Sequence, residues 1–87
     1  MYELMWSKQA IKDWKRLDRS KYVEKAKILL GIIEKNPYQD PPLLRTMQGN
    51  LKGTYSRKIS GKHRMMYEVS EQKKEVYLIG MWTHYHE

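Results

Sequence analysis

The chain has 87 residues and no cysteine, and its 17 lysines and arginines outnumber its 10 aspartates and glutamates, giving a net charge of +7. This length predicts one small domain, residues 1–87, and the lack of cysteine excludes disulfides, thiol nucleophiles and thiolate metal sites and suits a reducing compartment. The N-terminal residues form no long apolar run, so we predict neither a signal peptide nor a membrane partner and expect a cytoplasmic protein.

The first elements are predicted to be a strand and a helix. The stretch YELMW, residues 2–6, has the composition of a short strand, and Ser7 is a good N-cap for a helix that follows it. Four apolar residues then recur at helical spacing: Ala10, Ile11, Trp14 and Leu17. We expect this stripe to face the core.

A second helix is predicted over residues 20–35. It carries the clearest apolar stripe in the chain, formed by Tyr22, Ala26, Leu29, Leu30 and Ile33. The stretch NPYQDPP ends the helix because Pro37, Pro41 and Pro42 cannot continue it.

The rest of the chain has the pattern of strands. Three strands are expected at 54–59, 63–69 and 75–84, joined by turns at 60–62 and 70–74, with a further short strand near Leu44–Met47. The order β-α-α-β-β-β predicts an α+β fold with two N-terminal helices packed on one face of a small antiparallel sheet.

Alternation along the strands predicts which side chains share a face. In the second long strand, Met65, Tyr67 and Val69 should lie under the helices. In the last strand, Ile79 and Met81 should do so, and Tyr77 shares their side. The uncovered face would then hold Lys58, Arg64 and His84, although one bulge would exchange the faces.

The positive charge is concentrated on these strands. No acidic residue occurs between Pro41 and Tyr67, a segment whose basic residues are Arg45, Lys52, Arg57, Lys58, Lys62, His63 and Arg64. Such a cluster favours phosphate-bearing partners, with binding that weakens as salt rises. A basic surface that is only solvated is the alternative.

These residues suit the cleavage of RNA by its own 2′-hydroxyl, which needs neither a metal nor a protein nucleophile. The protein must accept the 2′ proton, stabilise the charged phosphorane and protonate the 5′ leaving oxygen. Arg64 is suited to charge stabilisation, with Lys58 and Arg57 adding to the field, and His84 to proton donation. Tyr55 or Tyr85 could stack on a base.

A metal site at the tail is the competing explanation of the terminal stretch HYHE. His84 and His86 would share a strand face, but zinc requires at least one further ligand, for which His63 and Glu87 are candidates without motif spacing. We therefore predict no metal and no cofactor.

The stretches GNLKGTYSRKISGKHRMMYEV and MWTHYHE resemble the YoeB/Txe family of toxins, in the RelE/ParE superfamily. The matching positions are Leu51, Gly53, Tyr55, Ser56, Arg57, Ile59, His63, Arg64, Tyr67, His84 and Tyr85. The resemblance implies a RelE/YoeB-like fold and a ribosome-dependent endoribonuclease that cuts mRNA. It also implies a cognate antitoxin of the YefM/Phd type and a possible homodimer.

Carried over by position, the resemblance implies that Arg64 stabilises the transition state, His84 is the general acid, Tyr85 places the substrate and Lys58 replaces a family arginine. It also implies a substrate-binding set made of Arg45, Gln48, Lys52, Tyr55, Arg57 and His63.

One departure from the family pattern concerns the general base. The family commonly has a glutamate where this chain has Arg45, and a lysine where it has Gln48. The base could come from His84, His63 or ribosomal RNA, or the site could work with basic residues alone. Otherwise the toxin could be weak or inactive and act as an RNA- or antitoxin-binding module. Poisoning of DNA gyrase, as by ParE-like relatives, is a further alternative.

Overall fold

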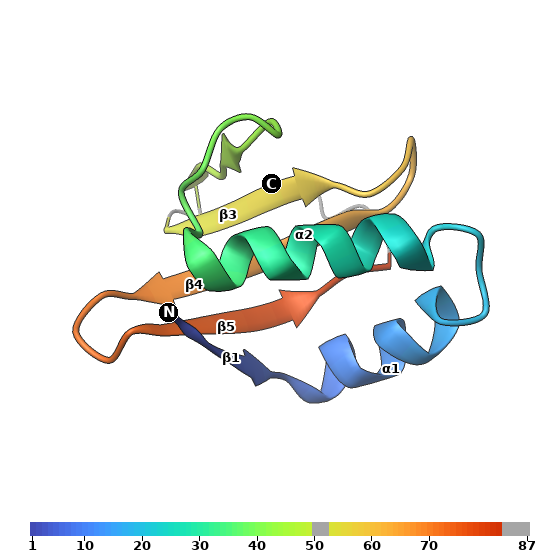
Figure 1. Ribbon diagram of the computed structural model, residues 1–87, viewed down its shortest axis with the longest axis horizontal. Helices are drawn as coiled ribbons and strands as arrows, with labels where there is room; N and C mark the ends of the chain where they lie inside the picture. The colour runs from blue at the N-terminus through green and yellow to red at the C-terminus, as the bar shows by residue number, and fades with distance from the viewer. Residues whose placement is uncertain (50–52, 83–87) are drawn as a thin grey trace.

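The computed structural model describes residues 1–49 and 53–82 and has both helices on one face of a five-stranded sheet (Figure 1). In chain order the elements are β1 (Glu3–Trp6), α1 (Lys8–Leu17), α2 (Val23–Lys35), β2 (Arg45–Thr46), β3 (Thr54–Lys58), β4 (Arg64–Ser70) and β5 (Glu75–Gly80). The predicted fold class and element order are confirmed, including the short strand at β2. Within the described residues, no helix is both long and apolar enough to cross a membrane.

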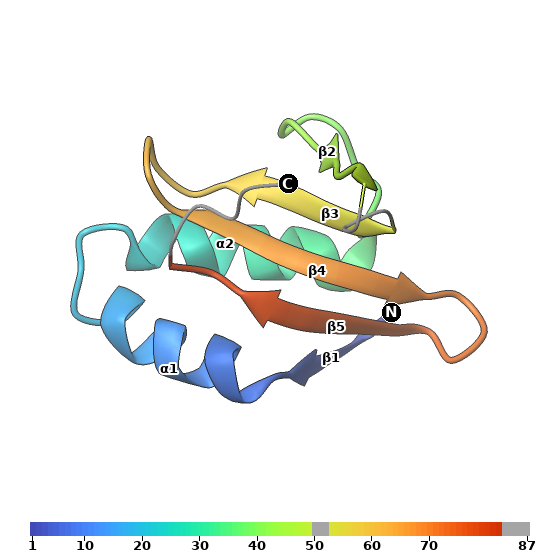
Figure 2. The same cartoon turned by 180° about the vertical axis from the view of Figure 1, so that it is seen from behind.

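The sheet is mixed, with strand order β1-β5-β4-β3-β2. β1 runs parallel to β5, whereas the other neighbouring strands are antiparallel. The chain therefore leaves one edge of the sheet after β1, forms both helices on one face, and returns at the opposite edge. The other face has no helix over it and is called the open face below (Figure 2).

The start of α1 is fixed by Ser7, as predicted. Its hydroxyl oxygen accepts a hydrogen bond from the Ala10 N–H at 3.0 Å and donates one to the Ile79 carbonyl at 2.8 Å. The cap thus satisfies a free N–H of the first turn and also joins the helix to β5.

The buried side of α1 differs from the prediction in two residues. Ala10 and Leu17 are buried, but Ile11 is 46% exposed, so its predicted place in the core is wrong. Asp13 is buried instead, and one of its carboxylate oxygens, Oδ2, accepts the Met81 N–H at 2.9 Å. A carboxylate therefore holds the end of β5 against α1.

The second helix begins three residues later than predicted and buries the expected stripe. Ala26, Leu29 and Ile33 are fully buried, and Leu30 packs against the same core. The helix ends at Lys35, and the carboxamide oxygen of Asn36 accepts the Tyr38 N–H at 3.0 Å. The prolines that follow keep the chain from continuing as a helix.

The face prediction is confirmed for β4 but fails in part for β5. Met65 and Tyr67 lie in the core with Val69 packed against them, whereas Tyr77 is 48% exposed and Val76 and Leu78 are buried in its place. A register shift between β4 and β5, at Met66/Tyr67, accounts for the difference. The shift leaves one extra residue in β5, which exchanges the faces of the residues that follow it. Met81 therefore returns to the core, as predicted.

Candidate functional site

Three cations from three neighbouring strands lie on the open face. Arg45 on β2 pairs with Ser56 on β3, and Lys58 on β3 pairs with Arg64 on β4. Directly paired residues of antiparallel strands point to the same face, and residues two apart on a strand do so as well. The cationic face, defined as Arg45, Lys58 and Arg64, is therefore one continuous surface.

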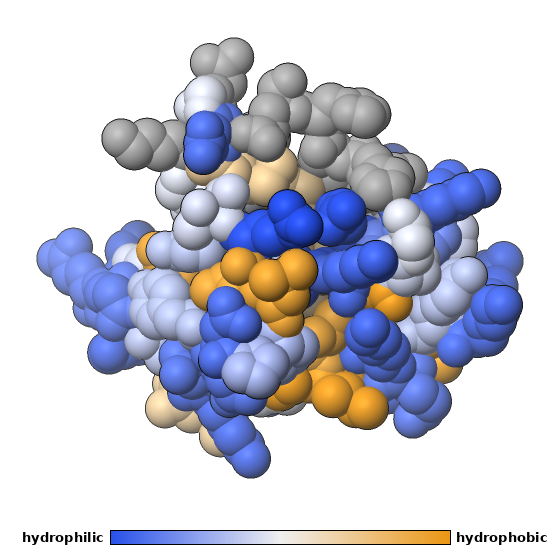
Figure 3. All heavy atoms as spheres, turned by 90° about the horizontal axis from the view of Figure 1, so that it is seen from above, coloured by the Kyte–Doolittle hydropathy of each residue, from blue (hydrophilic) through white to orange (hydrophobic). Residues whose placement is uncertain are grey.

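Residues on the opposite face confirm this orientation. Tyr67 belongs to the core, and its hydroxyl accepts a hydrogen bond from Arg57 Nε at 3.0 Å. Because Arg57 points toward the helices, its neighbours Ser56 and Lys58 point to the open face. The view onto the β2 edge shows strongly hydrophilic side chains beside a hydrophobic patch (Figure 3).

The residues between the three cations of the cationic face are buried and form its floor. Ser56 and Met66 form a cross-strand pair there, and each is 2% exposed. Arg64 is half-buried, whereas Arg45 and Lys58 are exposed. Charge on a partly buried side chain acts more strongly than charge in water, so Arg64 is the cation best placed to act on a bound anion.

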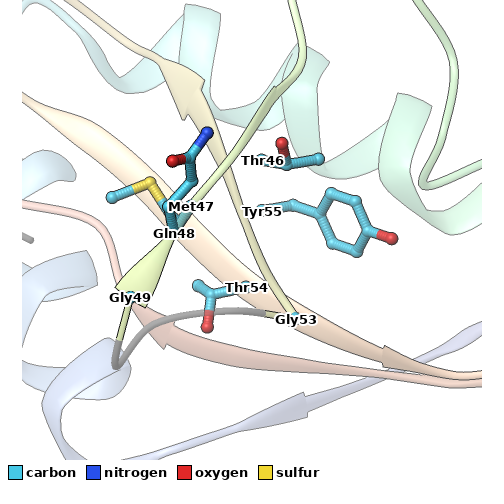
Figure 4. A pocket seen from close by; sticks show the side chains of 7 residues that line it. All are labelled: Thr46, Met47, Gln48, Gly49, Gly53, Thr54 and Tyr55. Carbon is cyan, nitrogen blue, oxygen red and sulfur yellow. The ribbon is translucent and has the colours of Figure 1, made fainter.

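A hollow of about 490 Å³ lies between β2 and the start of β3 (Figure 4). It is lined by Thr46, Met47, Gln48, Gly49, Gly53, Thr54 and Tyr55. Small-ligand clefts typically measure roughly 300–1,000 Å³. Two predicted substrate-binding residues, Gln48 and Tyr55, line this hollow, but the Tyr55 ring stacks on the core residue Tyr67 at 5.8 Å and so lies on the helix side of the sheet, not on the cationic face.

Arg57 does not belong to the binding surface on which it was expected. Its side chain is 1% exposed, and its guanidinium also donates to the carbonyl oxygens of Pro42 at 2.8 Å, Gln39 at 2.7 Å and Pro37 at 3.2 Å. Burial raises the pKa of the Tyr67 hydroxyl beside it, although Arg57 acts to lower that pKa. Arg57 therefore holds the segment after α2 against the sheet, and its predicted contact with substrate is wrong.

His63 is also drawn away from the cationic face. Its ring stacks on Trp82 at a centroid distance of 4.1 Å and meets the Tyr22 ring edge-on at 5.5 Å. Its Nδ1 contacts the Trp82 carbonyl. His63 thus packs where the chain leaves β5, which the predicted substrate contact did not anticipate.

Three predicted site residues lie outside the described residues: Lys52, His84 and Tyr85. The pairing of Arg64 with His84 therefore stays a prediction. The histidines of the alternative metal site at the tail, His84 and His86, lie there too. Among residues 1–49 and 53–82, no group of three His, Asp or Glu side chains could hold a metal ion.

Two carboxylates near the sheet were not singled out by sequence reasoning. Glu68 shares the open face with Arg64 and pairs with Thr54 and Tyr77. Its place directly after the segment without acidic residues was the available signal.

The second carboxylate, Glu71, lies in the turn after β4. It accepts hydrogen bonds from the hydroxyls of Tyr38 at 2.6 Å and Tyr2 at 2.8 Å, and from Lys74 Nζ at 3.0 Å. The bond from Tyr38, with those from Lys74 and Tyr2, lowers the pKa of Glu71 to about 2. This cluster joins the start of β1 and the segment after α2 to the turn between β4 and β5, and no sequence pattern indicated it.

Comparison with known proteins identifies the family. The model of the "YoeB-like toxin of bacterial type II toxin-antitoxin system" matches residues 6–85. The chain belongs to this family. A search of curated proteins finds no match to this toxin.

Solved structures agree with this assignment. The YoeB/ParE toxin from Agrobacterium tumefaciens is 26% identical, with a TM-score of 0.86 over 95% of this toxin and 99% of that chain. YoeB in a YoeB–YefM complex from Staphylococcus aureus is 27% identical, with a TM-score of 0.80 over 98% of this toxin and 99% of that chain. YoeB in a dimer from the same organism is 27% identical, with a TM-score of 0.80 over 97% of this toxin and 98% of that chain.

Proposed function

We propose that this toxin is a ribosome-dependent, metal-independent endoribonuclease that cleaves mRNA through attack of the 2′-hydroxyl on the neighbouring phosphate. The observation that carries the proposal is the cationic face, which lies on the side of the sheet without helices. Membership of the YoeB-like family supports it.

The geometry of the face supports anion binding. Lys58 and Arg64 are directly opposite each other on neighbouring strands, so their side chains share one face and can both bind a single phosphate. In the proposed mechanism Arg64 binds the phosphorane oxygens through its fork of donors, while Lys58 adds positive charge.

The remaining steps are assigned to residues that the family resemblance supplies. His84 donates the proton to the 5′ leaving oxygen, and Tyr85 places the substrate. Arg45, at the position of the family glutamate, binds RNA instead of accepting a proton. Glu68 stands four residues from Arg64 along β4, about 13 Å at the usual rise per residue, so it is too far along the strand to act on the same phosphate. Because His84 must start protonated to act as the acid, the base is assigned to a group of the ribosome.

The antitoxin partner is proposed to be of the YefM/Phd type. The S. aureus relative was crystallised in complex with YefM. A disordered acidic segment that folds on the cationic face would cover Arg45, Lys58 and Arg64 and block RNA.

A second copy of the toxin is proposed to cover an apolar groove of about 380 Å³ between β1, α1 and α2. The groove is lined by Trp6, Ile11, Trp14, Lys15 and Leu30. The exposed Ile11 side chain and the dimer formed by the S. aureus relative support this pairing.

The experiment maps mRNA 5′ ends on purified ribosomes by primer extension, with and without EDTA. New ends should appear with the wild-type toxin, persist in EDTA and disappear with Arg64→Ala. Arg45→Glu should decrease cleavage if Arg45 binds RNA as proposed, whereas an increase would show that a missing base limits the rate, since a general base typically contributes about 10²–10⁴-fold.

The two alternatives predict other outcomes, one on ribosomes and one in cells. The replacement of the family glutamate by Arg45 favours an inactive module, which would bind ribosomes and leave every message intact. A gyrase poison would stop DNA replication before translation in cells that express it.

A further inference from the structure

We propose that Ser56 is a phosphate-binding residue, whose buried hydroxyl donates a hydrogen bond to a phosphodiester oxygen of RNA held by Arg45, Lys58 and Arg64. The proposal rests on the proposed function and adds a neutral donor to a site described so far by its charges.

The first argument is the state of the hydroxyl in the free protein. Ser56 is 2% exposed, and its Oγ has no hydrogen-bond partner within residues 1–49 and 53–82. Buried polar groups are nearly always hydrogen-bonded, because an unpartnered group loses its bonds to water without replacement. An apolar residue of the same size would avoid this cost, so the hydroxyl has no evident structural benefit.

The second argument is its position. Ser56 lies between Arg45 on β2 and Met66 on β4, and the Lys58–Arg64 pair is the next pair along the same face. Residues two apart on a strand are about 7 Å from each other. The hydroxyl is therefore at the centre of the three cations, on a floor where its neighbour Met66 offers no competing donor.

The third argument concerns what a phosphate requires. Its oxygens accept several hydrogen bonds, and the long side chains of Arg45 and Lys58 can supply donors only from the surface, where both are exposed. A short hydroxyl supplies a donor from below. Because the hydroxyl is buried, the side chains over it must move to admit the anion, and exclusion of water from the floor then strengthens the bond.

The test measures binding of a 2′-O-methyl RNA oligonucleotide, which cannot be cleaved by 2′ attack, to the purified toxin. Ser56→Ala should weaken binding roughly tenfold or more, as expected for a lost bond to a charged acceptor. Its melting temperature should stay the same or rise. Ser56→Thr keeps the hydroxyl and should bind as the wild-type protein does.

Ser20→Ala is the matched control. The Ser20 hydroxyl donates to the Leu17 carbonyl at 2.8 Å and accepts the Tyr22 N–H at 3.1 Å, on the helix side of the molecule. Its removal should lower the melting temperature and leave RNA binding unchanged. Ser56→Ala should thus reduce RNA binding without loss of stability, and Ser20→Ala should reduce stability without loss of RNA binding.

Unchanged RNA affinity of Ser56→Ala would overturn the proposal, as would loss of its fold, which would reveal a structural role for the hydroxyl. Inorganic phosphate serves as a competitor: a loss of phosphate binding with RNA affinity intact would assign the hydroxyl to a free anion and also overturn it. Because the oligonucleotide is not cleaved, the result stands apart from whether the wild-type toxin cuts mRNA.

Discussion

Adjacent basic residues on β3 are expected to have opposite roles, which a pair of alanine substitutions can separate. Arg57 is buried and donates to Tyr67 and to three carbonyl oxygens, those of Pro37, Gln39 and Pro42. Lys58, the next residue, is exposed on the open face. Arg57→Ala should therefore destabilise the fold, and Lys58→Ala should weaken RNA binding without destabilising it.

The size of the Arg57 effect follows from its contacts. A hydrogen bond to a charged group contributes about 1.5–3 kcal/mol. The carbonyls of Gln39 and Pro42 are only partly buried and regain water, and that of Pro37 keeps the Tyr67 hydroxyl at 2.6 Å. We therefore expect a loss of about 3 kcal/mol in the free energy of unfolding. With a urea slope of about 1 kcal/mol per M, the midpoint should fall by about 3 M.

The assay is urea unfolding followed by tryptophan fluorescence, together with binding of the same 2′-O-methyl RNA by each folded variant. If Arg57→Ala left the urea midpoint unchanged and reduced RNA affinity as much as Lys58→Ala does, Arg57 would be a substrate-binding residue. The structural interpretation of its burial would then be wrong.

Three further outcomes are expected. Asp13→Ala should lower the free energy of unfolding by about 1–3 kcal/mol, because it leaves the buried Met81 N–H without its acceptor; Asp13→Asn, which keeps an oxygen, should lose less. Glu71 has a pKa of about 2 in the fold and 4.5 as its ordinary value, so its stabilisation is present above about pH 4.5 and is lost as the pH falls toward 2. Glu71→Gln should lower the melting temperature at pH 6, with the difference vanishing near pH 2. Ile11→Asp should shift sedimentation from dimer to monomer, whereas Ile28→Asp, which is exposed but does not line the groove, should not.

Each of these has an opposing result. Equal stability of the wild-type protein and Asp13→Ala would remove that carboxylate from the account of β5. A pH-independent difference for Glu71→Gln would mean that the carboxylate does not titrate as described. A monomeric wild-type toxin would leave the groove to another partner.

Much of the fold follows from local sequence patterns. The stripe of Ala26, Leu29 and Ile33 and the proline-containing segment after it specify α2, and Ser7 specifies the start of α1. These signals depend on neighbours within a few residues, which a sequence displays directly. The register of β5 does not follow from such local patterns, because the shift at Met66/Tyr67 arises from pairing between strands.

The site was predicted less completely, for a physical reason. Alternation in β3 and β4 placed Lys58 and Arg64 together on the open face, as the register has them. Alternation also placed Arg57 on the opposite face, but its position in a basic segment suggested a contact with substrate. The carbonyl oxygens that bind Arg57 instead belong to residues distant in the sequence, so no local pattern revealed them. The burial of Asp13 and the lone hydroxyl of Ser56 likewise depend on tertiary contacts.

The most direct test of the central claim is a structure of the toxin on a ribosome whose mRNA carries a 2′-O-methyl group at the cleavage site. The account predicts that the scissile phosphate lies on the open face, within hydrogen-bond distance of the Arg64 guanidinium. An mRNA bound along the helix side, or a phosphate distant from Arg64, would contradict it.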